Sequence, residues 1–235
     1  FDLGNLEEEL TSQSYLSKII MQEPNNLFNY CNVGYQTYFN SQEEISLLDN
    51  LFFDTYRLGE AKISENIEPA FRNADIVSID IGAVRQSEAS GNNNSSPNGF
   101  YGEEICAISR YAGLSDKVSS FGIYEYNSKH DNNDQTAHLI AQMIWYFIEG
   151  VNFRVKDYPF SGKENYQKFT VLLEEDEPLL FYKSNKSGRW WIEINILSNN
   201  KYKRHALIPC TYKDYKDATK QLIPEKWYKA MRKMV

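Results

Sequence analysis

The chain has 235 residues, of which 42% are hydrophobic and 14% aromatic, and its formal net charge is −7. This length suits one large domain or two small ones, and the spread of aromatic residues excludes general disorder. An acidic balance without a basic stripe argues against nucleic acid as the main partner. The three cysteines lie far apart, which excludes a small disulfide-stapled fold and a clustered cysteine zinc site.

The sequence shows no signal for export or for a membrane. No apolar run approaches the roughly 20 residues that cross a bilayer. Residues 1–4 have neither the basic nor the apolar region of a signal peptide, and there is no initiator Met. We therefore expect a cytoplasmic protein without a membrane partner, whose first residue lies within a longer polypeptide.

The first quarter of the chain predicts two helices and a strand. Part of residues 5–21 shows helical spacing, and residues 30–35 form a short apolar run typical of a buried strand. Ser41, with Glu44 three positions later, forms a capping box, which predicts a helix start.

The next segment predicts helices that alternate with parallel strands. A short helix is expected over residues 63–71, and residues 74–81 form a continuous apolar run, as in a parallel sheet covered on both faces. Residues 86–98 are polar and turn-forming, which indicates a surface loop. A helix over residues 102–112 and a strand over residues 117–124 follow.

Glycines are expected to close the two main helices. Gly113 follows the helix over residues 102–112, and Gly150 takes the C-cap position of the strongest predicted helix, residues 134–150. One side of that last helix is apolar, as in an amphipathic helix. The residues on that side are Ala137, Ile140, Ala141, Ile144, Trp145 and Ile148.

The last third of the chain changes to antiparallel structure. Residues 169–173, 179–183 and 190–197 are β-prone, residues 184–188 predict a hairpin loop, and an amphipathic helix with a basic end closes the chain. We therefore expect an α/β domain portion over residues 1–155. A β-hairpin plus helix extension over residues 156–235 is expected to pack on the same domain.

Carboxylates follow two of the predicted parallel strands. In an open α/β sheet, ligands bind beyond the carboxyl ends of the strands, where Asp80 and Glu125 lie. An Asp-x-Asp pair at a strand end presents two carboxylates on one face to a hard divalent cation. Here Gly82 follows Asp80 two positions later, so the pair is incomplete.

Four segments carry short motifs, namely residues 77–82, 97–104, 122–127 with Asp131, and 134–137. Their order and approximate spacing resemble those of the ureohydrolases, the family of arginase, agmatinase and formimidoylglutamase. The family pattern is S-x-D-x-D, a glycine-rich turn into a helix, E-x-N-P-x-x-D, and a Thr-Ala that opens the next helix. Over residues 76–150 the chain resembles this pattern, and Asp2 looks like the last position of an earlier D-A-H-x-D motif.

The resemblance implies a three-layer α-β-α fold with a mainly parallel sheet and a dinuclear manganese centre. In the family, two Mn²⁺ ions ionise a bridging water that attacks an amidine or guanidinium carbon. The resemblance places Asp2 and Asp80 on metal and assigns Glu125, with Asn127, to the substrate. It also implies a homo-oligomer.

The chain departs from the family pattern at positions that bind metal. Gly82 replaces a ligand Asp, Ser128 replaces the Pro of the E-x-N-P turn, and Arg85 stands where the family tends to have Asp. The histidine motifs would lie before Phe1, so two Mn²⁺ ions are expected only if an N-terminal part supplies ligands. Two hypotheses follow: a metal-dependent hydrolase of an amidine or guanidino C–N bond, or a pseudoenzyme that binds a small molecule or a protein.

The remaining features have structural explanations. We expect His130, His138 and His205 to be surface or structural residues, and the three cysteines to be buried thiols. Trp190 and Trp191 are expected to cover a sheet rather than to stack on a ligand. The lysine-rich segment 213–233 is interrupted by carboxylates, which is typical of a solvated helix face.

Overall fold

The computed structural model describes residues 3–4, 9–11, 14–24, 27–159, 162–174, 177–194 and 206–234. The helices are α1 (Tyr15–Met21), α2 (Gln42–Asn50), α3 (Leu58–Ala61), α4 (Ser64–Asn73), α5 (Gly102–Leu114), α6 (Gln135–Asn152), α7 (Tyr212–Ala218) and α8 (Glu225–Met234). The strands are β1 (Cys31–Tyr35), β2 (Asp54–Arg57), β3 (Ile76–Asp80), β4 (Ser120–Tyr124), β5 (Tyr166–Val171), β6 (Leu179–Ser184), β7 (Trp190–Glu193) and β8 (Leu207–Cys210).

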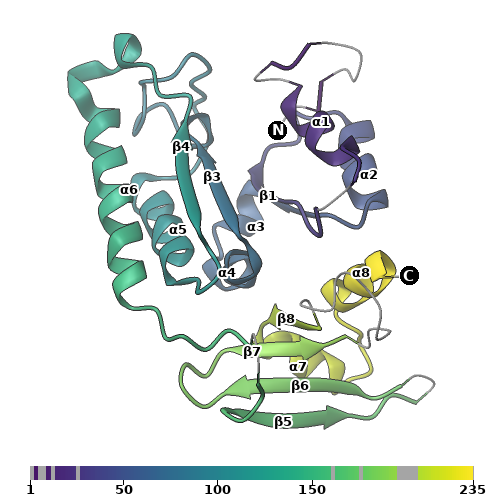
Figure 1. Cartoon of the computed structure of the whole chain (residues 1–235). Coiled ribbons are helices and arrows are strands. Elements are labelled where there is room, and N and C mark those ends of the chain that lie inside the picture. The colour runs from purple at the N-terminus through teal and green to yellow at the C-terminus, as the bar shows by residue number, and fades with distance from the viewer. Residues whose placement is uncertain are drawn as a thin grey trace.

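The strands form two two-stranded parallel sheets and one four-stranded antiparallel sheet (Figure 1). β1 pairs with β2, β3 pairs with β4, and the antiparallel sheet has the order β5-β6-β7-β8. The predicted α/β class with parallel strands and a C-terminal antiparallel element is therefore confirmed. The predicted hairpin lies between β6 and β7, and it belongs to a larger sheet because β8 adds a further strand.

The capping box predicted near residue 41 is present at the start of α2. The Ser41 hydroxyl accepts a hydrogen bond from the Glu44 N–H at 3.1 Å, and the Glu44 carboxylate accepts one from the Ser41 N–H at 2.9 Å. These two bonds satisfy amide groups that have no partner within the helix. β2, which follows α2, was not predicted, because its sequence Asp-Thr-Tyr-Arg contains no apolar run.

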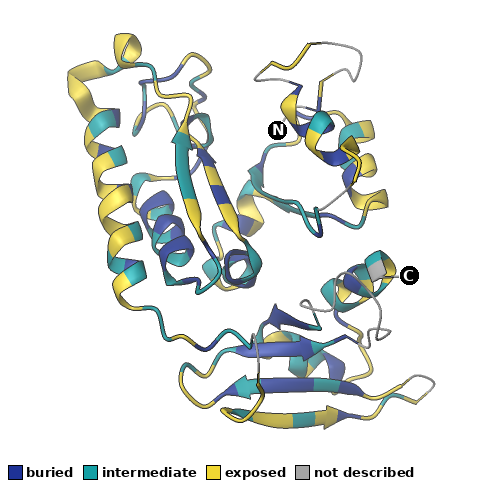
Figure 2. Cartoon of the chain, viewed as in Figure 1, coloured by how far each residue is buried: buried dark blue, intermediate teal, exposed yellow. Residues whose placement is uncertain are grey.

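The main hydrophobic core lies on one face of the β3–β4 sheet. Val77 and Ile79 point into this core and pack with residues of α4, α5 and α6. Ile76, Ser78 and Asp80 alternate with them along β3 and are exposed. In Figure 2, β3 accordingly alternates between buried and exposed residues. Within the described part of the chain, helices thus cover one face of this sheet, whereas the apolar run predicted cover on both.

Gly113 and Gly150 lie in the last turns of α5 and α6, one and two residues before the helix ends, and not at the closing positions predicted. A Cβ atom on Gly150 would lie 2.9 Å from the Cα of Gly113, so the two helix backbones approach closely at this point. Glycine therefore serves helix packing here, and the helices continue through both positions. A C-cap and a close backbone contact both favour glycine, so the local pattern did not distinguish them.

α6 spans 18 residues and buries one side, which includes Leu139 and Met143. Part of its predicted apolar side faces solvent: Ile144, Trp145 and Ile148 are 44%, 59% and 54% exposed. Among the described residues, none of the helices is both long enough and apolar enough to span a bilayer.

A second hydrophobic core lies between the C-terminal sheet and the helices α7 and α8. Phe181 and Ile192 are fully buried, and the ring of Trp190 stacks on Tyr215 of α7 with centroids 4.9 Å apart. α7 begins at a capping box formed by Thr211 and Asp214. The aromatic residues of the last third therefore cover a sheet, as predicted.

Side chains of the first part of the chain bind the C-terminal part directly. The Arg72 guanidinium of α4 donates hydrogen bonds to the carbonyl oxygens of Trp190 and Cys210 at 3.0 and 2.8 Å. Lys229 of α8 forms an ion pair with Asp49 at 3.0 Å. These contacts join the two parts of the chain; the division near residue 155 and the packing of the extension on the same domain stay predictions.

Candidate functional site

The parallel pairing of β3 and β4 brings two of the predicted site residues to one sheet edge. Asp80, the last residue of β3, is paired in register with Tyr124, the last residue of β4, and Glu125 follows directly. Asp80 and Glu125 are both exposed. Parallel strands end at the same edge of a sheet, so the sequence correctly placed both carboxylates at the carboxyl edge of β3 and β4, and their role in binding stays a prediction.

One oxygen of the exposed Asp80 carboxylate is bound by the protein backbone. Its Oδ1 accepts a hydrogen bond from the Gly82 N–H at 2.7 Å, which caps the short 3-10 turn Ile81–Ala83. Oδ2 makes no protein hydrogen bond among the described residues. One carboxylate oxygen therefore fixes the orientation of the group, and the other is open to a ligand.

Glu125 has an unusual backbone conformation. Its φ angle is +64°, in the left-handed region. A side chain with a Cβ adopts such a conformation at a cost of roughly 1–3 kcal/mol, and residues held in this way cluster at functional sites. The conformation turns the chain sharply at the end of β4, where the Glu125 carboxylate lies in solvent.

Tyr15 of α1 joins this acidic pair from a distant part of the sequence. Burial raises the pKa of the Tyr15 hydroxyl, and the negative charges of Asp80 and Glu125 raise it further. Both carboxylates are thus near enough to act on the same phenol, which is 48% exposed. No motif surrounds Tyr15, so sequence reasoning did not identify it.

Asn127 holds the loop that follows β3 against the loop that follows β4. Its backbone N–H donates to the Gly91 carbonyl at 2.8 Å, and its side-chain amide donates to the Asn93 amide oxygen at 2.7 Å. The Asn127 amide oxygen accepts from the Lys129 N–H at 3.0 Å. These bonds position the loop beside Asp80 and Glu125 and leave one amide N–H of Asn127 for a ligand.

Asp131 and Thr136, two further motif residues, lie just before and within the first turn of α6. The Asp131 carboxylate accepts hydrogen bonds from the N–H groups of Thr136 and Ala137 at 2.8 and 2.9 Å. Partial desolvation acts against the ionised form, but these bonds and those from the Thr136 and Tyr126 side chains lower the pKa of Asp131. The Thr136 hydroxyl accepts from the Gly91 N–H at 2.8 Å, so both residues organise the loops.

Arg85, predicted to place a cation near the site, stacks on an aromatic ring. Its guanidinium carbon lies 3.5 Å from the centroid of the Tyr101 ring, at the start of α5. This contact accounts for the position of the Arg85 side chain in structural terms.

The described residues do not fit a dinuclear metal centre. They contain no group of three or more His, Cys, Asp or Glu side chains that could hold a metal ion. Gly82 contributes no ligand, Asp2 and His205 lie outside the described residues, and His130 and His138 are exposed. Of the predicted metal ligands, the structure places only Asp80.

Comparison with known proteins decides the family. A model of the arginase family matches residues 1–149. The chain belongs to the arginase family. The match covers the region in which the ureohydrolase motifs were found, so the resemblance is confirmed. No curated protein sequence matches this arginase-family chain.

Solved structures of the same family are similar to this arginase-family chain at low identity. Formiminoglutamase from Trypanosoma cruzi is 17% identical, with 52% of this chain and 44% of that chain covered and a TM-score of 0.49, and one such structure carries Mn²⁺. Formimidoylglutamase from Bacillus subtilis is 19% identical, covering 52% and 41% with a TM-score of 0.46. Arginase from Bacillus subtilis is 14% identical, covering 49% and 42% with a TM-score of 0.43. The chain spans less than half the length of these proteins.

Proposed function

We propose that this member of the arginase family binds the planar cation of an amidine or guanidino compound through Asp80 and Glu125. The observation that carries the proposal is the meeting of the two exposed carboxylates at adjacent strand ends, where both raise the pKa of Tyr15. Asn127 and the strained backbone of Glu125 hold the loops around them.

The chemistry of this pair suits a planar cation. A carboxylate accepts two parallel N–H bonds from an amidine or guanidinium group, and these charge-assisted bonds are among the strong ones. Asp80 offers one oxygen that the Gly82 N–H leaves open, and Glu125 offers an exposed carboxylate. The Tyr15 hydroxyl adds a neutral donor or acceptor at neutral pH.

Binding without hydrolysis is the function that the described residues support best. Hydrolysis in the manner expected from the resemblance needs a metal-activated water, and the described residues lack the ligands for two ions. Gly82, with no side chain, stands beside Asp80 where a second carboxylate is needed.

A manganese-dependent hydrolase of an amidine or guanidino C–N bond is the second candidate. It is favoured by the position of Asp80 at a strand end, with one oxygen unused by the protein. In this case Asp2 and ligands outside the described residues would complete the site, and Glu125 and Asn127 would hold the substrate.

Calorimetry on the full-length protein tests the first proposal. We expect agmatine, L-arginine or N-formimidoyl-L-glutamate to bind without added metal, and Glu125→Gln and Asp80→Asn to weaken that binding by about tenfold. Glu164→Gln, which removes an exposed carboxylate beside β5, is the matched control and should bind as the wild type does. If none of the three compounds binds, the proposal is wrong.

The same preparations separate binding from hydrolysis. Under the first proposal, neither urea nor formamide is released with or without Mn²⁺. Product that forms only with Mn²⁺, and that Asp80→Asn abolishes, establishes the second candidate in its place.

We also infer a cytoplasmic location and self-association. The exposed apolar side chains Ile144, Trp145 and Ile148 on α6 support an intermolecular contact, because monomeric proteins rarely leave a contiguous apolar patch uncovered. Light scattering coupled to gel filtration measures the mass in solution, and a monomer at all concentrations contradicts self-association.

A further inference from the structure

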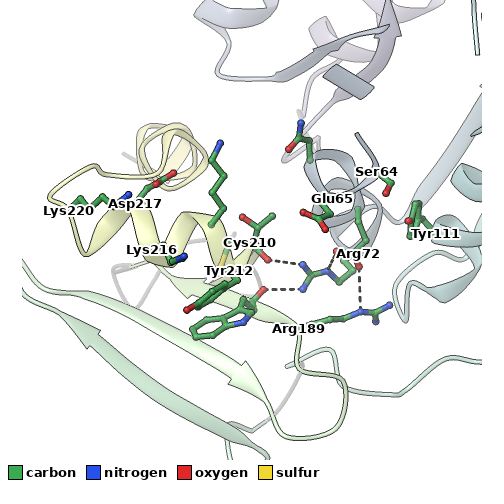
Figure 3. Close-up of a pocket in the computed structure, with 15 residues that line it drawn as sticks. Ser64, Glu65, Arg72, Tyr111, Arg189, Cys210, Tyr212, Lys216, Asp217 and Lys220 are labelled. Atoms are coloured by element: carbon green, nitrogen blue, oxygen red, sulfur yellow. Dashed lines mark hydrogen bonds and ion pairs between the residues drawn. The ribbon is translucent and has the colours of Figure 1, made fainter. Parts of the chain in front are cut away.

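A cleft of about 720 Å³ lies between α4 and the C-terminal part of the chain, at a place distinct from Asp80 and Glu125. In Figure 3, Ser64 and Tyr111 line one side of the cleft, and Tyr212 and Lys216 line the opposite side. Small-molecule sites have volumes of roughly 300–1,000 Å³ and occur preferentially between packed units. The cleft therefore has the size and the location of a ligand site.

On the floor of the cleft, hydrogen bonds and ion pairs join three charged side chains, of which Arg72 is buried and Glu68 and Arg189 are half-buried. Arg72 donates to Glu68 at 2.9 Å and to the carbonyl oxygens of Trp190 and Cys210, and Arg189 forms a second ion pair with Glu68 at 3.4 Å. These contacts appear as dashed lines in Figure 3. Because both arginines are engaged, they shape the floor and leave ligand binding to other side chains.

Three lysines supply positive charge to the cleft, namely Lys213 and Lys216 on α7 and Lys220 in the turn that follows it. Lys213, Lys216 and Lys220 all line the cleft and are all exposed. Lys213 and Lys216 are three residues apart and lie on one side of α7, and the Lys216 ammonium lies 5.5 Å from the centroid of the Tyr212 ring. Among the described residues, no carboxylate forms an ion pair with any of the three.

The charge of the cleft is opposite in sign to that of the whole chain. Five of its lining side chains are cationic and three are carboxylates, although the chain carries a net charge of −7. The lining therefore has an excess of two positive charges, and a positive surface raises the local concentration of anions. An anionic ligand is therefore favoured.

An aromatic platform lies beside these lysines. Tyr212 is 53% exposed, and its ring centroid lies 5.5 Å from that of the buried Trp190. Tyr215 stacks on Trp190 at an interplanar angle of 22° and holds this platform in place. A planar ring can stack on an exposed, fixed aromatic side chain with a gain of about 1–3 kcal/mol per ring.

We propose that this cleft binds a small organic phosphate with a planar heterocycle, that is, a nucleotide. Lys213, Lys216 and Lys220 hold the phosphate, and Tyr212 stacks on the ring. The proposal is independent of the amidine site, since the two share no residue.

Titration calorimetry of the full-length protein with adenosine monophosphate tests this proposal. Lys213→Ala with Lys216→Ala should raise the dissociation constant by about tenfold, since each exposed charge contact changes affinity up to about fivefold. Lys129→Ala with Lys168→Ala removes the same charge from exposed positions outside the cleft and is the matched control. It should leave the dissociation constant unchanged. Equal weakening by the two double variants overturns the lysine assignment.

Two further probes separate the phosphate from the ring. Adenosine and inorganic phosphate should each bind at least tenfold more weakly than adenosine monophosphate. Tyr212→Leu should weaken the nucleotide by about tenfold and leave inorganic phosphate unaffected. If adenosine binds as tightly as adenosine monophosphate, the lysines do not bind the phosphate. If inorganic phosphate binds as tightly as adenosine monophosphate, Tyr212 does not stack on the ring. If none of the three probes binds, the whole proposal is overturned.

Discussion

Gly113 of α5 and Gly150 of α6 lie in direct backbone contact where the two helices cross. A Cβ atom on Gly113 would lie 3.0 Å from the Cα of Gly150 and would overlap the carbonyl oxygen of Phe147. A Cβ atom on Gly150 would lie 2.5 Å from the carbonyl oxygen of Arg110. Because these obstacles are backbone atoms, the helices must separate to admit a methyl group.

Alanine at either glycine should therefore destabilise the protein. We expect Gly113→Ala and Gly150→Ala each to lower the free energy of unfolding by about 1–3 kcal/mol, the usual cost of overpacking. Gly59→Ala is the control, since a Cβ there has nothing within 4 Å and Gly59 is in a helix. Urea unfolding measures all three, and equal stability of the three variants contradicts the helix contact.

Glycine at position 125 should separate stability from binding. Glu125→Gly relieves the left-handed conformation and should raise the free energy of unfolding by about 1 kcal/mol, while it removes amidine binding. Lys156→Gly is the control, because Lys156 also has a positive φ, of +54°, and lies in the segment after α6. It should gain stability and keep amidine binding. If the free energy of unfolding of Glu125→Gly is lower than that of the wild type, the backbone at position 125 is not strained.

A second carboxylate beside Asp80 should raise the affinity for Mn²⁺. A Cβ on Gly82 would lie 3.0 Å from Oδ1 of Asp80 and 4.0 Å from the amide oxygen of Asn92, so Gly82→Asp needs only a small shift of the Asp80 side chain. We expect at least tenfold tighter Mn²⁺ binding by calorimetry, since adjacent carboxylates suit a hard cation. Gly82→Ala adds the same Cβ without charge and should not change the affinity. Unchanged affinity in Gly82→Asp means that the Asp-x-Asp alignment is wrong.

Acid should weaken the start of α6 through Asp131. The pKa of Asp131 is lowered in the folded protein, so its ionised form adds stability that is present above the unfolded pKa of about 4. That stability is lost as the pH falls through the lower, folded pKa. Asp131→Asn should be less stable than the wild type at neutral pH, and the difference should shrink in acid. Urea unfolding of both proteins across this range measures it, and a constant difference contradicts the role of the charge.

Local signals predicted the parts of the fold that rest on local chemistry. The Ser41–Glu44 capping box, the apolar runs of β3 and β4, and the carboxylates that follow them needed only residues close in sequence. The strands β2 and β8 were missed for different reasons: β2 has no apolar run, and the apolar run of β8 contains Pro209, which argues against a strand in sequence.

Contacts between distant segments explain what sequence reasoning missed at the site. The charges of Asp80 and Glu125 act on Tyr15 only because the fold brings α1 near them, and no pattern around Tyr15 in the sequence indicates this. Asn127 was predicted for the substrate from its motif, and the structure adds its bonds to the opposite loop. The assignment of Asp80, Glu125 and Asn127 to ligands stays a prediction until binding is measured.

The bonds of Arg72 have a consequence for any attempt to shorten the protein. Its guanidinium is almost fully buried and depends on two carbonyl oxygens that belong to β7 and β8. Cutting the chain after residue 155 would remove both acceptors and the sheet that covers Arg72, and would leave Glu68, at 2.9 Å on the same helix, as its ion-pair partner. The C-terminal sheet thus supplies two hydrogen-bond acceptors to a cation of the arginase-family part, and water would have to replace them in a shortened protein.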